Sequence, residues 1–323
     1  NSTNSLKKNE TVRIFTGAPM PNNADTVVMQ ENAIEVNDKV SFIKKPKKNE
    51  NCRLAGEDIL KNQLIFEKGS IIESHNQSIL ASIGLNSVDV FKKISVGFFT
   101  SGNELENPTQ NLIGSQINNS NKYALSNLIR GSGFFAHDLG ILKDNFNQVK
   151  KSIFESINNF DVIITTGGAS VGDEDYLIKV MKELGNIIFW KTAIKPGRPL
   201  AFGLINQKPI ICLPGNPVSV FLLFGMLIKP LLIKIAGGKW KEPDFIPAKI
   251  NFKMKKKTAR MEWLRVYIDK KIEKELVVNI YPKQGSGIIS SIAFSDGIIE
   301  IPEDKSELNP GDIFRFYPKG FLY

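Results

Sequence analysis

The sequence predicts an α/β protein with a central, doubly wound, mainly parallel sheet, flanked by a small β domain with a helical linker and by a C-terminal β-barrel. Strand-like and helix-like segments alternate from about residue 94 to about residue 242. One apolar strand pattern there breaks into two glycines and opens a helix, and short strand patterns separated by turn residues fill both flanks. The predicted parts are 1–70, 71–93, 94–242 and 243–323.

The stretch 161–175, DVIITTGGASVGDED, combines a strand, glycines and carboxylates. Val162–Thr166 is β-branched and apolar, as in a buried parallel strand, and Gly167 and Gly168 follow at once. Glycines that open a helix present free backbone N–H groups to an anion, and nearby carboxylates favour a divalent cation beside a phosphate. An ordinary tight turn is the alternative, and the glycines alone would favour it. Glycines and carboxylates together favour a phosphate site.

Composition sets the class of protein. The chain has 323 residues, of which 42% are apolar and 23% charged, as in soluble globular proteins. The longest apolar run, near 218–228, ends at Lys229-Pro230, short of the roughly 20 residues that a membrane span needs. With no secretory signal in its first residues and only Cys52 and Cys212, the chain is expected to be cytoplasmic, without disulfides. It starts without Met in a linker-like stretch, so we expect a preceding N-terminal piece.

The net charge of +9 favours anionic partners. The densest basic runs, 44–48 and 253–257, have no interleaved aromatic residues, and no nucleic-acid-binding module accompanies them. Solvated loop charge is therefore the favoured interpretation, and we expect neither nucleic acid nor membrane as a partner. Nucleic-acid binding remains an alternative that rests on charge alone and predicts salt-sensitive retention on DNA.

The N-terminal part alternates short apolar runs with Gly, Pro and Asn. Strands are predicted at 11–15, 25–31, 39–43 and 63–69. Thr16 lies in a turn, where its hydroxyl could cap a backbone group or contact a ligand. Helical spacing predicts a helix over 73–83.

The central part has helices with recognisable ends. Residues 118–120 and Asp144 are the expected N-caps of two helices. Asn216 and Pro217 open a long helix that ends at Gly237-Gly238, and Pro230 is expected to kink it. The predicted strands are 94–100, 133–139, 162–166, 187–190, 200–203 and 209–213, and the predicted helices are 121–130, 145–158, 176–184 and 217–236.

Polar side chains follow several of these strands. Glu104 comes after the first strand, and Lys191, Lys195 and Arg198 lie close together in a proline-stiffened loop. The segment 213–217, LPGNP, feeds the long helix. Because ligands of such sheets bind outside the carboxyl ends of the strands, we expect these loops to meet the glycine loop around one crevice suited to an oxyanion and a metal. Surface salt bridges and turn prolines would explain any one loop, but less readily all of them together.

The C-terminal part predicts a small closed barrel. Arg260 and Arg265 flank its first strand, and residues 284–287, QGSG, form a turn rich in hydrogen-bond donors. Turns are also expected at 295–297, in a hairpin, and at 309–312. The predicted strands are 260–268, 276–281, 287–294, 297–303 and 312–317.

In combination, these motifs resemble the molybdopterin molybdenumtransferase family, to which MoeA and the C-terminal region of gephyrin belong. They occur in the family's order and cover nearly the whole chain. The matching segments are RIFTGAP to DTVVMQE (13–31), RLAGEDI (53–59), TSGNEL (100–105), TTGGASVGDEDY (165–176), FWKTAIKPGRPLAFG (189–203), LPGNPVS (213–219) and QGSG (284–287).

The resemblance implies a central domain of the molybdopterin-binding type and the last step of molybdenum cofactor synthesis. Adenylylated molybdopterin is cleaved with release of AMP, and molybdate is inserted at the dithiolene with Mg²⁺ present. It also implies a homodimer, with the adenylyltransferase of the pathway as a possible partner. By this resemblance the metal ligands are Glu104 and Asp175, and the catalytic residues are Asp144, Asp175, Lys191 and Lys195. The implied substrate- or oxyanion-binding residues are Thr16, Gly167, Gly168, Ser170, Gly172, Arg198, Pro214, Asn216, Pro217, Arg260 and Ser286.

The chain departs from the family pattern at several positions. The family's early segment has no counterpart here, so an impaired dimer or an inactive piece is expected. Asn119 replaces the first residue of the family's Asp-Ser-Asn and removes a carboxylate. Asn103 stands in place of the commoner Asp, and Arg198 in place of Lys, which keeps the charge but lets a guanidinium grip an oxyanion in two places.

Two alternatives share this architecture. One is the molybdopterin adenylyltransferase, which is essentially the α/β domain alone, so the flanking β regions argue against it. The other is a non-enzymatic scaffold like gephyrin, for which no feature of this sequence provides a groove.

Overall fold

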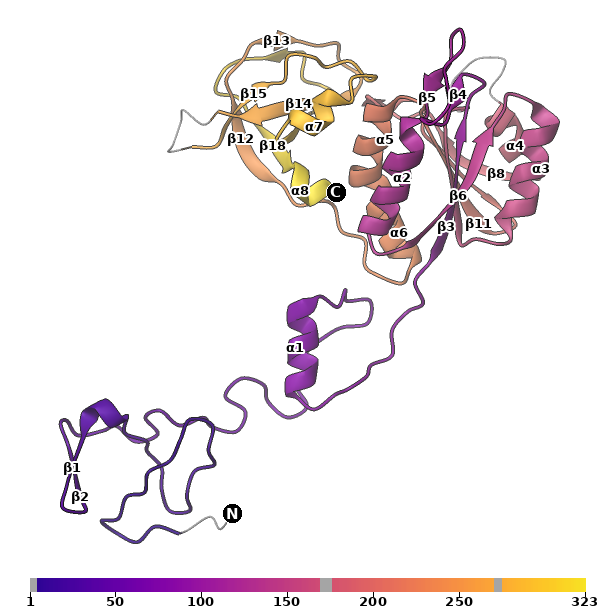
Figure 1. Ribbon diagram of the computed structural model, residues 1–323. Coiled ribbons are helices and arrows are strands. Elements are labelled where there is room, and N and C mark those ends of the chain that lie inside the picture. Colours follow the sequence, from indigo (N-terminus) through magenta and orange to yellow (C-terminus); the bar gives the residue numbers. More distant parts are fainter. Residues whose placement is uncertain (1–4, 169–175, 270–274) are drawn as a thin grey trace. The chain divides into compact units, whose positions relative to one another are not determined.

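The computed structural model describes residues 5–168, 176–269 and 275–323. Contacts divide the chain into two compact units, Asn1–Glu67 and Lys68–Tyr323, which are described separately here (Figure 1). This division is coarser than the four predicted parts, whose boundaries remain a prediction.

The first unit is mostly turn and loop. Its regular elements are η1 (Gln30–Asn32) and the hairpin of β1 (Ala33–Val36) and β2 (Lys39–Phe42). The predicted strand at 39–43 is confirmed, but those at 11–15, 25–31 and 63–69 are wrong. None of the described residues of this unit is buried. The apolar runs thus lack the covered face and paired neighbour that stabilise a strand.

The second unit starts with α1 (Ser74–Ser82), which confirms the helix predicted at 73–83. Glu73 caps it, and the amide N–H of Glu73 donates to Asn76 Oδ1 at 2.8 Å. No residue of α1 is fully buried, and Ile79 and Leu80 of its apolar stripe are half-buried.

The central sheet has the order β6-β3-β7-β11-β10-β8. The pairs β6–β3, β3–β7 and β7–β11 are parallel, and β10 runs antiparallel to both of its neighbours. The chain leaves β3 for β6 and then returns to β7 on the other side of β3, so the strand order reverses between β3 and β7. This confirms the doubly wound, mainly parallel sheet. The bounds are β3 (Ser95–Ser101), β6 (Phe135–Leu142), β7 (Val162–Thr166), β8 (Gly185–Trp190), β10 (Ala201–Ile205) and β11 (Lys208–Leu213).

Helices cover both faces of this sheet (Figure 1). On one face lie α2 and the long helix formed by α5, η2 and α6, and on the other α3 packs against α4. The short strands β4 (Leu105–Glu106) and β5 (Ile117–Asn118) pair beside the sheet. The helix bounds are α2 (Ser120–Gly131), α3 (Phe146–Ile157), α4 (Tyr176–Leu184), α5 (Pro217–Leu223), η2 (Phe224–Ile228) and α6 (Lys229–Ile235).

The long helix predicted at 217–236 is confirmed, but its apolar stretch is longer than expected. A π-helical turn at η2 precedes Pro230, and the helix continues past Lys229-Pro230 to Ile235. Within the described residues, Pro217–Ile235 is therefore one helix of 19 residues with the length and apolarity of a membrane span, and its most apolar 18-residue window has a mean hydropathy of 2.1. Because 61% of this apolar window is buried in the molecule, the helix packs as a core helix.

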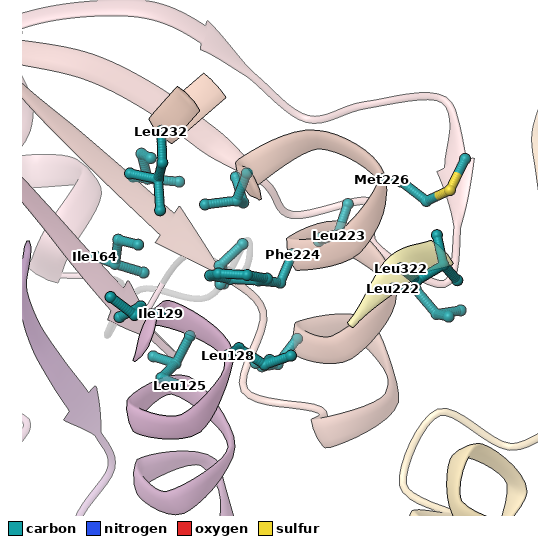
Figure 2. Packing of buried hydrophobic residues seen from close by; sticks show 14 of the residues in the cluster. Leu125, Leu128, Ile129, Ile164, Leu222, Leu223, Phe224, Met226, Leu232 and Leu322 are labelled. Atoms are coloured by element: carbon teal, nitrogen blue, oxygen red, sulfur yellow. The ribbon is translucent and has the colours of Figure 1, made fainter. Parts of the chain in front are cut away.

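Phe224 lies at the centre of the core between this helix, α2 and the sheet (Figure 2). Its side chain is fully buried, and Figure 2 shows it close to Ile129 and Ile164. We expect Phe224→Ala to lower the free energy of unfolding by about 3–5 kcal/mol, because it removes buried apolar surface and leaves a cavity. Urea denaturation tests this. Phe154→Ala, at a site that is 56% exposed, is the control and should change stability by no more than about 0.5 kcal/mol.

The C-terminal part forms a closed barrel in the order β15-β12-β18-β16-β14, completed by the pairing of β14 with β15. An apolar cluster fills its interior, and β9 (Ile194–Lys195), from the central domain, extends the barrel sheet by pairing with β14. The barrel strands are β12 (Ile246–Ile250), β14 (Met261–Ile268), β15 (Val277–Ile280), β16 (Gly297–Ile301) and β18 (Ile313–Pro318). Beside them lie β13 (Met254–Lys255), β17 (Glu307–Leu308), α7 (Ser290–Phe294) and α8 (Lys319–Leu322).

Two predictions in the barrel are wrong. Residues 287–294 were expected as a strand, but they contain the helix α7, on which Ser291 is buried beside Arg265. Consequently residues 295–297 connect α7 to β16 and do not form a hairpin. The turn at 309–312 is confirmed, with Gly311 at φ +93°.

Candidate functional site

Four strands of the central sheet end at one edge. The register aligns Thr166 at the end of β7 with Thr100 of β3 and with Leu213 at the end of β11. Ser101 of β3 likewise aligns with Leu142 of β6. The loops that follow β3, β7 and β11 therefore start side by side, as predicted, and the loop after β6 starts beside them. We call this edge of the sheet the rim.

The glycine corner after β7 is tightly packed against the neighbouring loops. The amide of Gly167 donates to the carbonyl of Leu213 at 2.9 Å. Gly167 and Gly168 have φ of +85° and +65°, and a Cβ at Gly167 would lie 2.5 Å from the carbonyl oxygen of Ser101. Only glycine fits this close approach. Three predicted residues of the same loop, Ser170, Gly172 and Asp175, lie outside the described residues.

Two carboxylates flank the loop after β3. The exposed side chain of Glu104 folds back over Gly102, so closely that a Cβ at Gly102 would collide with it. Asp144, after β6, accepts a hydrogen bond from the amide of Asn103 at 3.2 Å, and its own amide donates to Asn103 Oδ1 at 3.1 Å. Both predicted acids thus belong to the rim.

Asp144 was also expected to cap the next helix, and this is wrong. Asn145 is the N-cap of α3, and its side chain accepts from the amide of Gln148 at 3.1 Å. Asp144 pairs with Asn103 instead.

Substitutions can distinguish the roles of Asp144 and Asn145. Asn145→Ala should lower the free energy of unfolding by about 1 kcal/mol, because α3 loses its cap. Asp144→Asn should leave the α3 cap intact and act mainly on turnover, because Asp144 lies on the rim. Thermal unfolding and turnover of both variants check this. A loss of stability at Asp144→Asn that exceeds the loss at Asn145→Ala would contradict the assignment.

The loop after β11 connects the rim to two other elements. Asn121 of α2 donates to the carbonyl of Gly215 at 2.7 Å, and a Cβ at Gly215 would lie 3.5 Å from the Cα of Gly167. Pro214 is buried, and Pro217 occupies the first helical turn, as predicted. Asn216 holds the N-cap position of α5, but its side chain makes no capping hydrogen bond, contrary to the expectation. Its amide group is therefore not committed to the helix.

A turn of the barrel supplies the missing cap. The carbonyl of Ser286 accepts a hydrogen bond from the amide of Val218 at 3.1 Å. Ser286 thereby lies at the start of α5, next to the loop that touches Gly167. The barrel turn at 284–287 and the glycine corner are thus linked by consecutive contacts, as the proposed crevice requires.

The three cations of the 191–198 loop have different surroundings. The Lys191 ammonium lies 4.3 Å from the centroid of the Trp190 ring, and its backbone is left-handed, with φ +73°. Arg198 is exposed, and the adjacent Gly197 packs against Leu223 of α5. Lys195 lies in β9, where its Nζ is 3.2 Å from Glu262 Oε1 of the barrel. The loop therefore bridges the central domain and the barrel.

Sequence reasoning missed the role of Arg265. Its guanidinium is buried and donates to the carbonyls of Trp263 and Gly285 and to the Ser291 hydroxyl, at 3.2–3.4 Å. Burial lowers the pKa of Arg265 to about 10, so it stays charged at neutral pH. The available signal in the sequence was a charged residue in a strand whose other residues are expected to be buried. For Arg260, the predicted oxyanion ligand, the structure shows its carbonyl accepting from Lys256 Nζ at 2.8 Å.

Buried polar atoms without partners lie under the rim. Among the described residues, Thr166 Oγ1 and Asn121 Oδ1 are buried and make no hydrogen bond. Their neighbour Thr100 is satisfied, because its hydroxyl accepts from Asn119 at 2.7 Å. Buried polar groups are normally paired, so such orphans mark a place suited to water or a polar ligand.

Two predicted assignments stay open. Thr16 is exposed in the first unit, in a turn closed by the bond from the Ala18 amide to the carbonyl of Phe15. Its approach to the rim remains a prediction. Glu104 and Asp144 offer oxygen ligands of the kind that Mg²⁺ prefers. The described residues contain no group of three His, Cys, Asp or Glu side chains that could hold a metal, so the described donor set fits only in part.

The chain also matches family models along most of its length. The models are "MoeA N-terminal region (domain I and II)" over 1–84, "Probable molybdopterin binding domain" over 97–234 and "MoeA C-terminal region (domain IV)" over 247–319. A molybdopterin molybdenumtransferase of Haemophilus influenzae is 32% identical over 96% of this chain and 78% of that protein. The chain belongs to the molybdopterin molybdenumtransferase family.

Other members of the family agree with this. A molybdopterin biosynthesis protein of Methanocaldococcus jannaschii is 34% identical over 95% of this chain and 76% of its own length. The crystal structure of a molybdopterin biosynthesis MoeA protein from Pyrococcus horikoshii is 30% identical, with a TM-score of 0.78 over 99% of this chain and 78% of that one. The resemblance noted in the sequence is therefore confirmed, as is the fold it implied.

Proposed function

We propose that this chain is a molybdopterin molybdenumtransferase, which inserts molybdate into adenylylated molybdopterin and releases AMP. The observation that carries the proposal is the hydrogen bond from the Val218 amide to the Ser286 carbonyl, which brings the barrel turn to the rim of the sheet. A lone α/β adenylyltransferase domain would have no such turn. Contact between the barrel turn and the rim of the central sheet favours the transferase over the adenylyltransferase or a scaffold.

We propose a substrate-binding role for each group of residues around the crevice. The glycine corner and the cations Lys191, Lys195 and Arg198 would hold phosphate and molybdate oxygens, because preorganised donors and positive charges stabilise oxyanions. Gly167, Gly168, Pro214, Asn216 and Pro217 would shape the phosphate side, with Ser170 and Gly172 of the same loop. Ser286 and Arg260 would face the molybdate from the barrel, and Thr16 would come from the first unit of a partner chain.

Mg²⁺ is part of this proposal. Glu104 and Asp175 would hold it, with Asp144 beside them, and the ion would neutralise negative charge on the phosphoanhydride. Lys191 and Lys195 would supply positive charge to the phosphate chain.

We also propose a cytoplasmic homodimer. Support for a second copy comes from the first unit, where Phe15, Leu64 and Ile43 are 77%, 73% and 63% exposed. Apolar side chains left this exposed in a unit without buried residues are candidates for burial against a second copy. Sedimentation of the chain at several concentrations tests the dimer, and the adenylyltransferase of the same pathway can be added as a candidate partner.

One assay tests the reaction. With adenylylated molybdopterin, Mg²⁺ and molybdate, AMP should be released only when molybdate is present, and chelation of Mg²⁺ should stop the release. Consumption of ATP with unmodified molybdopterin would instead identify an adenylyltransferase. A scaffold is favoured if neither reaction occurs and if Asp175→Asn supports cofactor synthesis in cells as well as wild type does.

A further inference from the structure

Glu262 is a buried carboxylate at one end of the barrel. Its residue is 4% exposed, and it lies on the side of β14 that also carries Leu264 and Val266 of the barrel core. A carboxylate in such a place is costly unless a positive partner and hydrogen bonds compensate for the lost water. The groups around Glu262 should therefore explain why β14 carries an acid at this position.

The partner of Glu262 is Lys195. Lys195 Nζ lies 3.2 Å from Oε1 and 3.3 Å from Oε2, so both carboxylate oxygens accept from the same ammonium. The backbone fixes this pairing, because β9 and β14 are parallel with Lys195 in register with Glu262. Next to it the amide of Met261 donates to the carbonyl of Ala193 at 2.9 Å. The ion pair is thus a product of strand register and does not depend on flexible side chains alone.

The two partners differ in exposure. The Glu262 side chain is 6% exposed, whereas that of Lys195 is 54% exposed. The ammonium therefore has one side on a buried anion and another side open to solvent. An ammonium has three N–H donors, and the contact with both oxygens of one carboxylate leaves at least one of them for a ligand.

We propose that Glu262 is a positioning residue that holds the Lys195 ammonium for the oxyanion substrate. This rests on the proposed function. Glu262 lowers the net positive charge of the loop, so its contribution is to orientation and not to attraction of the anion. A lysine held by a buried carboxylate presents its free N–H in one direction, which lowers the cost of ordering a long, flexible side chain when the anion arrives.

The first test measures the pair without any turnover. Lys195→Met leaves the buried Glu262 unpaired, so its Tm should fall by about 4 °C or more, and adding Glu262→Gln should recover at least about half of that fall. Lys305→Met, which removes the lysine of an exposed ion pair with Asp312, is the matched control and should behave like wild type. Additive Tm changes in the Lys195/Glu262 cycle would overturn the pairing, whatever the protein's activity.

The second test measures positioning. Glu262→Gln should lower kcat for molybdate-dependent AMP release about tenfold or more, while KM for molybdate stays the same or falls, because one negative charge is lost. In the Lys195→Met background Glu262→Gln should have no further effect on kcat. An equal loss in both backgrounds would overturn the positioning role. If wild type itself releases no AMP while the Tm cycle shows coupling, the pair stands and only the proposed function fails.

Discussion

Gly167→Ala is expected to abolish most of the molybdate-dependent release of AMP, with a loss of about 100-fold or more. The new methyl group would lie 2.5 Å from the carbonyl oxygen of Ser101, and the left-handed φ of +85° adds about 1–2 kcal/mol of backbone strain. The corner must therefore shift away from the loop after β3. A displacement of about 1 Å among groups that position a substrate can cost about 100-fold in rate.

Gly140→Ala separates the two causes. Gly140 has φ +95°, but no atom lies within 4 Å of the place where its Cβ would be. This variant should show the strain alone, as a loss of about 1–2 kcal/mol in stability with turnover retained. Steady-state kinetics and urea unfolding of both variants measure the difference. If Gly167→Ala keeps wild-type turnover, the glycine corner does not belong to the site.

Arg265→Ala is expected to lower the free energy of unfolding by about 3–5 kcal/mol and to impair turnover. The change leaves a cavity on the face of β14 opposite to the barrel-core residues Leu264 and Val266. It also leaves the carbonyls of Trp263 and Gly285 and the Ser291 hydroxyl without their donor. The turn at 284–287 would lose its anchor, and with it the bond from Ser286 to Val218 at the start of α5. Chemical denaturation and molybdate-dependent kinetics measure both effects.

Two comparison variants sharpen the Arg265 experiment. Arg265→Lys keeps the charge but cannot donate in three directions from a planar group, so it should recover only part of the stability. Arg130→Ala, on the exposed end of α2, should stay within about 0.5 kcal/mol of wild type. Full recovery by lysine would mean that charge, and not the hydrogen bonds to the turn, is what matters at this position.

The central domain could be predicted from the sequence because its signals are local. β-branched runs such as Val162–Thr166, the glycines behind them and Pro217 at a helix start each reflect a backbone requirement that neighbouring residues meet. Convergence of the loops at the rim also followed, because the carboxyl ends of parallel strands share one edge. The residue-by-residue similarity to the family supplied the pterin and the molybdate, which no local pattern specifies.

The errors lie where distant contacts override local preference. Segment 287–294 has the composition of a strand, but it contains the helix α7, on which the Ser291 hydroxyl accepts a hydrogen bond from the buried guanidinium of Arg265. Asp144 has the chemistry of a cap, but it pairs with Asn103 of a distant loop, and Asn145 caps α3 instead. The apolar runs near 11–15 and 63–69 have strand spacing but no covered face in the described first unit. None of these partners is visible in the nearby sequence.

The most direct test of the account is a crystal of the protein soaked with AMP and molybdate, examined by anomalous scattering at the molybdenum absorption edge. The account predicts a molybdenum peak in the crevice bordered by Lys195, Arg198 and Ser286, beside the glycine corner at Gly167. A fully occupied peak elsewhere, with this crevice closed by side chains, would contradict it.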